Sequence, residues 1–132
     1  MTDKETNPTA QTMDREHQIQ IGLIDALCQA SEQVSESSAK AAEILAQLVS
    51  YSSAHFMSEE LLMRIASYDG YEDHVADHIY MMDELDAMVA RQQAGEAMTV
   101  LESGRAIRDF ITRHIDTRDR LFAESMVATT HR

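Results

Sequence analysis

The chain has 132 residues, which is enough for one domain and too few for a separate cofactor domain. Hydrophobic residues make up 44% of it, and only 4 Gly and 1 Pro are present, a composition typical of all-helical proteins with few turns. The formal net charge of −12, from 11 Lys and Arg against 23 Asp and Glu, argues against binding to nucleic acid or to an anionic membrane surface.

Two helices are predicted in the N-terminal half of the chain. Residues 1–12 are polar and aperiodic, and they predict a short disordered arm. Apolar residues then recur at helical spacing over residues 13–31, and Ser38 is a candidate N-cap for a long second helix. This second helix should end near Tyr68, before an Asp-Gly turn signal at residues 69–70.

Two more helices are predicted in the C-terminal half. The third covers residues 72–93 and is ended by Gly95, and the fourth follows it to beyond residue 120. Four helices of this length with short connections predict an all-α protein, an antiparallel up-down-up-down four-helix bundle over residues 13–126. Residues 127–132 are expected to form a C-terminal tail.

The single cysteine, Cys28, cannot form an internal disulfide, which fits a reducing compartment. No apolar run is long enough for a membrane span, and none opens the chain as a signal peptide would. We therefore expect a cytoplasmic protein that is not attached to a membrane.

Histidines are the unexplained part of this acidic, aromatic-poor composition. Five of the six lie on the apolar stripes of the predicted helices: His17, His55, His74, His78 and His114. The sixth, His131, falls in the tail. Two carboxylates accompany the inward-facing five. Glu59 follows His55 by four residues, a rotation of only about 40°, whereas Asp119 follows His114 by five, about 140°, and should approach it from the side.

Taken singly, each of these residues has a structural explanation, because a core histidine is more often simply hydrogen-bonded. Five imidazoles and two carboxylates buried together would instead need an extensive polar network in a small core. The set therefore predicts a metal site inside the bundle.

Seven protein ligands are too many for one ion and suit two, and imidazole with carboxylate favours iron, manganese, zinc or cobalt over calcium or magnesium. We consider two six-coordinate ions bridged by Glu59, Asp119 and one hydroxide. The five histidines then fill all but one of the remaining positions. A single open position predicts a site that binds one small ligand end-on.

The motifs HFMSEE from His55, HVADH from His74 and HIDTRD from His114, together with His17, resemble those of the hemerythrins in order and spacing, particularly the single-domain bacterial members. The resemblance covers most of the chain, from about residue 13 to residue 121. It implies a four-helix bundle that holds two iron ions, bridged by an oxo or hydroxo group, and binds O2 reversibly.

The resemblance also assigns the metal ligands. It places one iron on His74, His78 and His114, the other on His17 and His55, and makes Glu59 and Asp119 the bridges. O2 would bind end-on at the two-histidine iron as a hydroperoxide, whose proton comes from the bridging hydroxide. This agrees with the single open position counted above.

An apolar ligand pocket would keep the bound ligand dry. The resemblance implies that its wall includes Ile21, Phe56, Phe110, Ile111 and Ile115. Many members have Trp at the position of Phe110, so the wall here leaves more room. Gln20 is a larger departure, because the family usually places an apolar side chain three residues after the first histidine. Its amide either turns towards solvent or a neighbouring polar group, or contacts the bound ligand or an ordered water.

We expect an oxygen carrier, store or sensor rather than an enzyme, whose partner is O2 or another small diatomic or anionic ligand. The main alternative is a di-iron peroxidase or nitric-oxide-handling enzyme on the same scaffold, which Gln20 in the ligand pocket would favour. The chain contains no Glu-x-x-His motif of the kind found in carboxylate-rich di-iron proteins. Its histidine-rich set donates less negative charge to iron, which favours binding of oxygen over its cleavage.

Overall fold

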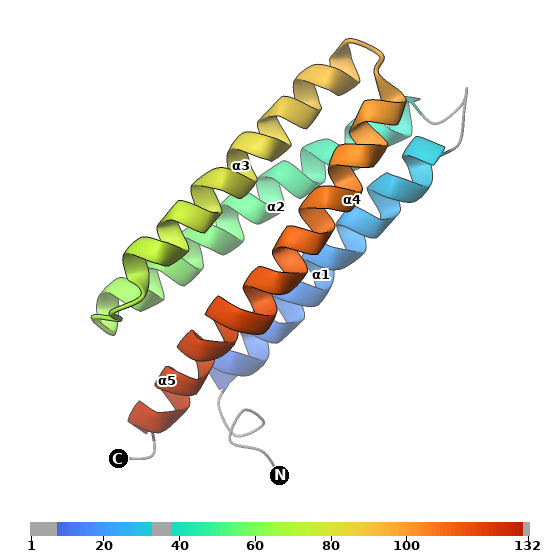
Figure 1. Ribbon diagram of the computed structural model, residues 1–132. Helices are drawn as coiled ribbons and strands as arrows, with labels where there is room; N and C mark the ends of the chain where they lie inside the picture. The colour runs from blue at the N-terminus through green and yellow to red at the C-terminus, as the bar shows by residue number, and fades with distance from the viewer. Residues whose placement is uncertain (1–7, 33–37, 131–132) are drawn as a thin grey trace.

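A computed structural model describes residues 8–32 and 38–130 of the chain. These residues form α1 (Pro8–Glu32), α2 (Ser38–Ile65), α3 (Tyr71–Gln93), α4 (Ala97–His114), the π-helical turn η2 (Ile115–Asp119) and α5 (Arg120–Thr130). The helices alternate in direction, so that α1 begins and α5 ends at the same end of the molecule (Figure 1). Each helix packs on two neighbours, α1 and α3 both contacting α2 and α4. The predicted four-helix bundle is confirmed.

The first and last helices extend further than the sequence pattern indicated. α1 begins at Pro8, five residues before the predicted start, because proline is well suited to the first position of a helix, where its missing N–H is not needed. The predicted arm is therefore helical over residues 8–12, and residues 1–7 lie outside the described part. α5 continues through Thr130, so the predicted tail is helical over residues 127–130, while His131 lies outside the described residues.

The turn between α2 and α3 uses a serine in the left-handed conformation. α2 ends at Ile65, three residues before the predicted end, and Ser67 follows with a φ of 51°. The Tyr68 N–H donates to the Met63 carbonyl at 2.9 Å, which satisfies one of the last carbonyls of α2. α3 then begins at Tyr71, one residue before the predicted start, and ends at Gln93 as predicted.

The turn between α3 and α4 has the same construction with a glycine. Gly95 has a φ of 79°, and the Glu96 N–H donates to the Arg91 carbonyl at 3.0 Å. Glycine adopts this conformation without a steric cost, whereas a residue with a Cβ does not. The turns on either side of α3 are thus equivalent, with Ser67 in one and Gly95 in the other as the residue of positive φ.

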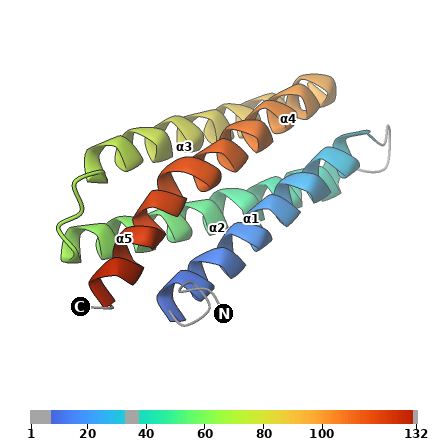
Figure 2. The same cartoon turned by 60° about the horizontal axis from the view of Figure 1, so that its bottom comes forward.

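The fourth predicted helix is one continuous helical rod with a π turn inside it (Figure 2). At the end of η2 the Arg120 N–H donates to the Ile115 carbonyl, five residues back instead of four. A π turn therefore holds one residue more than an α-helical turn, and every side chain after it is rotated relative to the α-helical pattern.

The apolar core is divided into two clusters. The larger is built from residues such as Ile24, Leu48, Leu85 and Ile107, and the smaller comprises Met13, Met63 and Phe122 with Tyr68 and Tyr71 packed against it. Along α1 and α3 the predicted metal ligands fall between the residues of these two clusters, whereas on α2 Phe56 of the larger cluster lies between His55 and Glu59. None of the helices in the described part combines the length and the apolarity that crossing a membrane requires.

We expect opposite effects on stability from two substitutions in the equivalent turns. Ser67→Gly should raise the free energy of unfolding by about 1 kcal/mol, because it relieves the left-handed strain, and Gly95→Ala should lower it by about 1 kcal/mol. Urea unfolding followed by circular dichroism measures both. Effects of the same sign for the two variants would contradict this account of the turns.

Candidate metal centre

Seven side chains that could bind a metal are buried in the middle of the bundle. The exposed fraction is 7% for His17 and at most 4% for the others: His55, Glu59, His74, His78, His114 and Asp119. α1 supplies one of them, α2 and α3 two each, α4 one and η2 one. The structure thus brings together every metal ligand that the sequence predicted.

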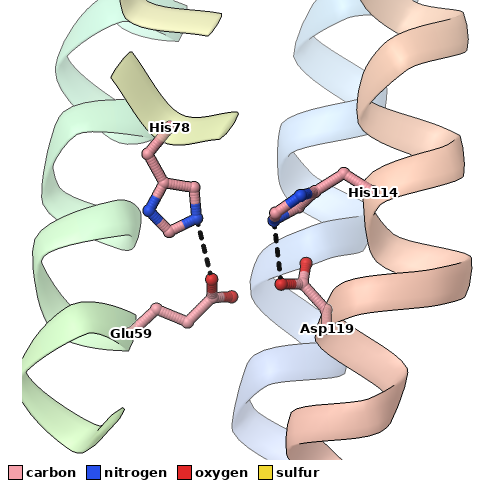
Figure 3. Close-up of side chains that lie close together, drawn as sticks. All are labelled: Glu59, His78, His114 and Asp119. Atoms are coloured by element: carbon pink, nitrogen blue, oxygen red, sulfur yellow. Dashed lines mark ion pairs between the residues drawn. The ribbon is translucent and has the colours of Figure 1, made fainter. Parts of the chain in front are cut away.

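Glu59 is reached from three helices. Its Oε2 lies 3.2 Å from Nε2 of His17 and 3.1 Å from Nε2 of His55, and its Oε1 lies 3.1 Å from Nε2 of His78. Figure 3 shows the His78 ring and the Glu59 carboxylate extending from their helices towards the centre of the bundle.

Asp119 occupies an equivalent position on the other side of the cluster. Its Oδ1 lies 2.8 Å from Nε2 of His74 and 3.0 Å from Nε2 of His114, and its Oδ2 lies 3.0 Å from Nε2 of His17. In Figure 3 the carboxylates of Asp119 and Glu59 point towards each other across the space between α2 and α4.

The π turn is what brings Asp119 inward. In a regular α-helix a residue five positions after His114 would be rotated by about 140° from it, and the sequence analysis accordingly expected a sideways approach. Because η2 holds one extra residue in the turn, Asp119 is carried back to the face of His114, 3.0 Å from its ring nitrogen. The expected sideways approach is therefore wrong, and the π turn is the physical reason.

Three of the histidine rings are fixed from behind by carboxylates that the sequence analysis did not single out. The Nδ1–H of His55 donates to Glu16, that of His78 to Glu60 and that of His114 to Asp77, each at 2.8 Å. A carboxylate only accepts, so the hydrogen is on Nδ1, and in the neutral ring Nε2 is left with its lone pair directed at the cluster.

A simple signal in the sequence marks these three carboxylates. Glu16, Glu60 and Asp77 each stand next to a predicted ligand in the chain, beside His17, Glu59 and His78. A residue adjacent to an inward-facing one is rotated by about 100° and so faces the neighbouring helix. Asp77 is itself held by Arg118 of η2, whose Nε donates to it at 2.6 Å.

Several atoms of the cluster lack the hydrogen bonds that buried polar atoms normally make. Nε2 of His55, His78 and His114 and Oε1 of Glu59 are buried without a hydrogen-bond partner, although each lies within 3.1 Å of another nitrogen or oxygen atom of the cluster. Buried polar atoms are rarely left unsatisfied in this way. The lone pairs of these nitrogen and oxygen atoms converge but cannot hydrogen-bond to one another. Such a group of atoms is suited to binding cations.

Six of the seven side chains fall into two groups of donors that share one carboxylate, and His74 belongs to neither group. Glu59, His78, His114 and Asp119 form one group, and His17, His55 and Glu59 the other, with the ligand atoms of each group within 4.8 Å of one another. Imidazole and carboxylate are ligands for iron, manganese, zinc or cobalt. The arrangement can therefore accommodate cations at two adjacent positions.

Charge compensation in the cluster is visible in the pKa values. Burial alone would lower the pKa of His17, but its hydrogen bonds with Asp119 and Glu59 outweigh burial and raise the pKa to about 9. Burial would raise the pKa of Glu59 and of Asp119, but the surrounding histidines hold both pKa values well below the usual range. Both carboxylates are thus held in the ionised form, and protons on His17, His55 and His114, whose pKa values are raised, balance them when no metal does.

The residues predicted to form the ligand pocket lie in different surroundings. Phe56 is buried and stacks on the His78 ring with centroids 4.1 Å apart, and Ile111 belongs to the larger core cluster. Ile21 and Ile115 line a cavity together with His17. Phe110 is half-buried and packs on Tyr80 of α3 with ring centroids 4.6 Å apart.

Gln20, the departure from the family pattern, is buried, and its side chain is bonded to a neighbouring helix. It is 1% exposed, and its Nε2–H donates to Oγ of Ser52 on α2 at 2.9 Å. Gln20 and Ser52 stand three residues from His17 and His55 respectively, so the pair lies next to the histidines in both helices. Of the two alternatives for this amide, the structure displays the bond to a neighbouring polar group.

Comparison with known proteins gives one family. The family described as hemerythrin, with a hemerythrin HHE cation binding domain, matches residues 9–124. A protein named bacteriohemerythrin from Methylococcus capsulatus (strain ATCC 33009 / NCIMB 11132 / Bath) is 30% identical over 81 residues. These residues are 61% of this chain and 62% of that relative, so the match spans less than two thirds of the relative's length. No solved structure matches the chain.

The raised pKa of His17 predicts how the stability of the metal-free protein depends on pH. A histidine with a raised pKa stabilises the folded state fully below its ordinary value of 6.5, and this contribution is lost as the pH rises to about 9. The loss for His17 is up to about 3 kcal/mol, since each pKa unit corresponds to about 1.4 kcal/mol. Urea unfolding of the metal-free protein across this range measures it, with His17→Gln as the control that should show a weaker dependence. Stability that increased over the same range would contradict the assignment.

Proposed function

The chain belongs to the hemerythrin family, and we propose that it binds O2 reversibly at two non-haem iron ions held by the buried cluster of five histidines, Glu59 and Asp119. The observation that carries this proposal is the arrangement of the two carboxylates. Glu59 contacts His17 and His55 on one side and His78 on the other. Asp119 contacts His74 and His114 on one side and His17 on the other.

This arrangement supports a division of the ligands into two sets with the carboxylates between them. In the proposal His74, His78 and His114 would hold one iron, His17 and His55 would hold the second, and Glu59 and Asp119 would be ligands to both. The set with two histidines has one ligand fewer, which is where a small ligand would find an open position. The two donor groups that share Glu59 likewise separate His17 and His55 from His78 and His114.

Iron in this centre would supply the reversible change of oxidation state by which O2 is held and released. The contribution of the protein is to fix the donors. Glu16, Glu60 and Asp77 orient three rings through Nδ1, and Arg118 holds Asp77 in place. Apolar clusters close the bundle on both sides of the centre and limit the access of water and protons.

The proposal is tested by metal analysis and by oxygen titration of the purified chain. We expect about two irons per chain and a visible absorption band that appears when the reduced protein meets O2 and disappears when O2 is removed. Glu59→Gln should lower the iron content, because the shared carboxylate loses its charge. Glu43→Gln, on the exposed face of the same helix, is the matched control and should leave it unchanged. One zinc per chain in place of two irons would overturn the proposal.

The enzyme alternative, a di-iron peroxidase or nitric-oxide-handling protein, depends on the buried amide of Gln20. Such an amide could donate a hydrogen bond to a bound ligand and promote its reaction. In the structure one N–H of the Gln20 amide donates to Oγ of Ser52. This bond to a neighbouring helix favours a carrier, store or sensor over an enzyme. Rapid turnover of peroxide without a reversible absorption band would favour the enzyme.

Substitution of Gln20 separates the two functions. Gln20→Leu should lower the free energy of unfolding by about 1–3 kcal/mol, because the buried Ser52 hydroxyl loses its donor. It should leave the rates of O2 release and of autoxidation unchanged. The double variant Gln20→Leu with Ser52→Ala removes the unsatisfied group and should recover part of the stability. A marked change in autoxidation in both variants would show instead that the amide acts on the bound ligand.

A further inference from the structure

A cleft of about 580 Å³ runs along the junction of α1 and α4, which pack side by side (Figure 1). α1 contributes His17, Ile21 and Gly22 to its lining, and the opposite wall includes Thr112 and Ile115. A smaller cavity of about 100 Å³ continues along the same junction, and His17, Ile115 and Asp119 line it. Both hollows therefore reach a side chain of the buried cluster, and we call them together the α1–α4 cleft.

His17 differs from the other histidines of the cluster in two ways. Its exposed fraction of 7% is the largest among the seven buried ligands. Its Nδ1 is buried without a hydrogen-bond partner, whereas Nδ1 of His55, His78 and His114 is held by a carboxylate. The His17 ring is thus held by carboxylates at Nε2 alone, and none holds its Nδ1 at the point where the cleft meets the cluster.

A second cavity near the cluster is less open to it. It has a volume of about 190 Å³, lies between α2 and α3, and has His78 and Phe56 in its lining. There the Phe56 ring covers the His78 ring, with centroids 4.1 Å apart and an angle of 10° between the planes. Glu60 also holds Nδ1 of His78. A ligand in this cavity would therefore be separated from the cluster by the His78 ring, which Phe56 covers and Glu60 holds in place.

The charges on the α1–α4 cleft distinguish between classes of small ligand. Apart from the residues of the buried cluster, its charged lining residues are Asp14, Asp25 and Asp116 against Arg108 and Arg120, in a chain whose formal net charge is −12. The Arg108 guanidinium is already paired with Asp25 at 2.5 Å. A cleft with excess carboxylate repels anions and does not affect an uncharged molecule.

We propose that uncharged diatomic molecules reach the centre through the α1–α4 cleft past His17, and that the carboxylates of the cleft slow the arrival of anions such as azide. The proposal rests on the proposed function, because it concerns access to the same centre. To the proposed function it adds the path that ligands take to the centre. It also adds charge as the property by which the chain discriminates between ligands of similar size.

Gly22 allows the path to be blocked without harm to the fold. A Cβ placed at this residue meets no atom within 4 Å, so a larger side chain would extend into free space in the cleft. Leucine is also favoured over glycine inside a helix by about 1 kcal/mol. Gly22→Leu is therefore expected to fold at least as well as the natural chain.

The kinetic test compares Gly22→Leu with Ser53→Leu, which fills the α2–α3 cavity instead. Flash photolysis or stopped flow gives the O2 rates of the reduced, iron-loaded chain. Gly22→Leu should slow O2 association and release together by about tenfold, equivalent to about 1.4 kcal/mol of barrier, with the equilibrium affinity unchanged. Ser53→Leu should leave both rates as they are. A slower rate for Ser53→Leu alone would place the path between α2 and α3 and overturn the proposal.

The charge test uses azide and the oxidised, iron-loaded chain. Azide association should become faster as salt is added, because salt screens the carboxylates, while O2 association should not respond. Asp116→Asn should raise the azide rate by about twofold at low salt, the effect of removing one solvated and unscreened charge roughly 10 Å from the path. Asp83→Asn, a lining residue of the α2–α3 cavity, is the matched control and should change neither rate. Azide association that is independent of salt and of Asp116 would refute the discrimination.

A third measurement does not depend on iron. In the full chain loaded with diamagnetic zinc, dissolved O2 should enhance the NMR relaxation of the Ile21 and Ile115 methyl groups, and Gly22→Leu should reduce this enhancement. An enhancement at both methyl groups that Gly22→Leu leaves unchanged would contradict the path.

If the chain holds two irons and releases O2 but Gly22→Leu changes nothing, the path is wrong and the proposed function stands. If O2 reaches these methyl groups but no reversible band forms, the proposed function fails.

Discussion

Two ionised carboxylates in the interior of a small bundle are the constraint on which the rest of the structure depends. Glu59 and Asp119 are 1% and 3% exposed, and an uncompensated charge in such a place costs several kcal/mol. Each carboxylate is met by three imidazoles within 3.2 Å, and His17 serves both. Positive charge has to be present on the rings as protons or between them as cations. The same electrostatic requirement therefore underlies the pKa values and the capacity for metal.

The constraint shapes the bundle as well as the site. A polar layer divides the apolar core, so each side of it needs its own hydrophobic packing. The larger cluster continues from the layer along the bundle, and the smaller one, around Met63 and Phe122, closes the other side. Tyr68 belongs to this smaller cluster and packs on Phe122 with ring centroids 4.9 Å apart. The turn before α3 is thus part of the enclosure of the site.

Sequence periodicity predicted the bundle and the burial of the five histidines, because a 3.6-residue repeat reports which face of a helix points inward. It failed at Asp119, since the π turn changes the repeat and no residue pattern in the chain marks it. It also missed Glu16, Glu60 and Asp77, which lie off the apolar stripes. These residues are recognised only once neighbouring helices are placed. The bond from Gln20 to Ser52 joins two helices and likewise has no local signal.

The three carboxylates behind the rings follow the order of the chain. Glu16 on α1 holds a ring on α2, Glu60 on α2 holds one on α3, and Asp77 on α3 holds one on α4. Each supporting residue is the chain neighbour of a proposed metal ligand, so a helix displaced along its axis by one residue would misplace a residue of the buried cluster and a support together. The longitudinal alignment of the four helices is therefore fixed at the centre of the bundle by side-chain pairs. The connecting turns at the ends of the bundle therefore do not have to set this alignment through their lengths.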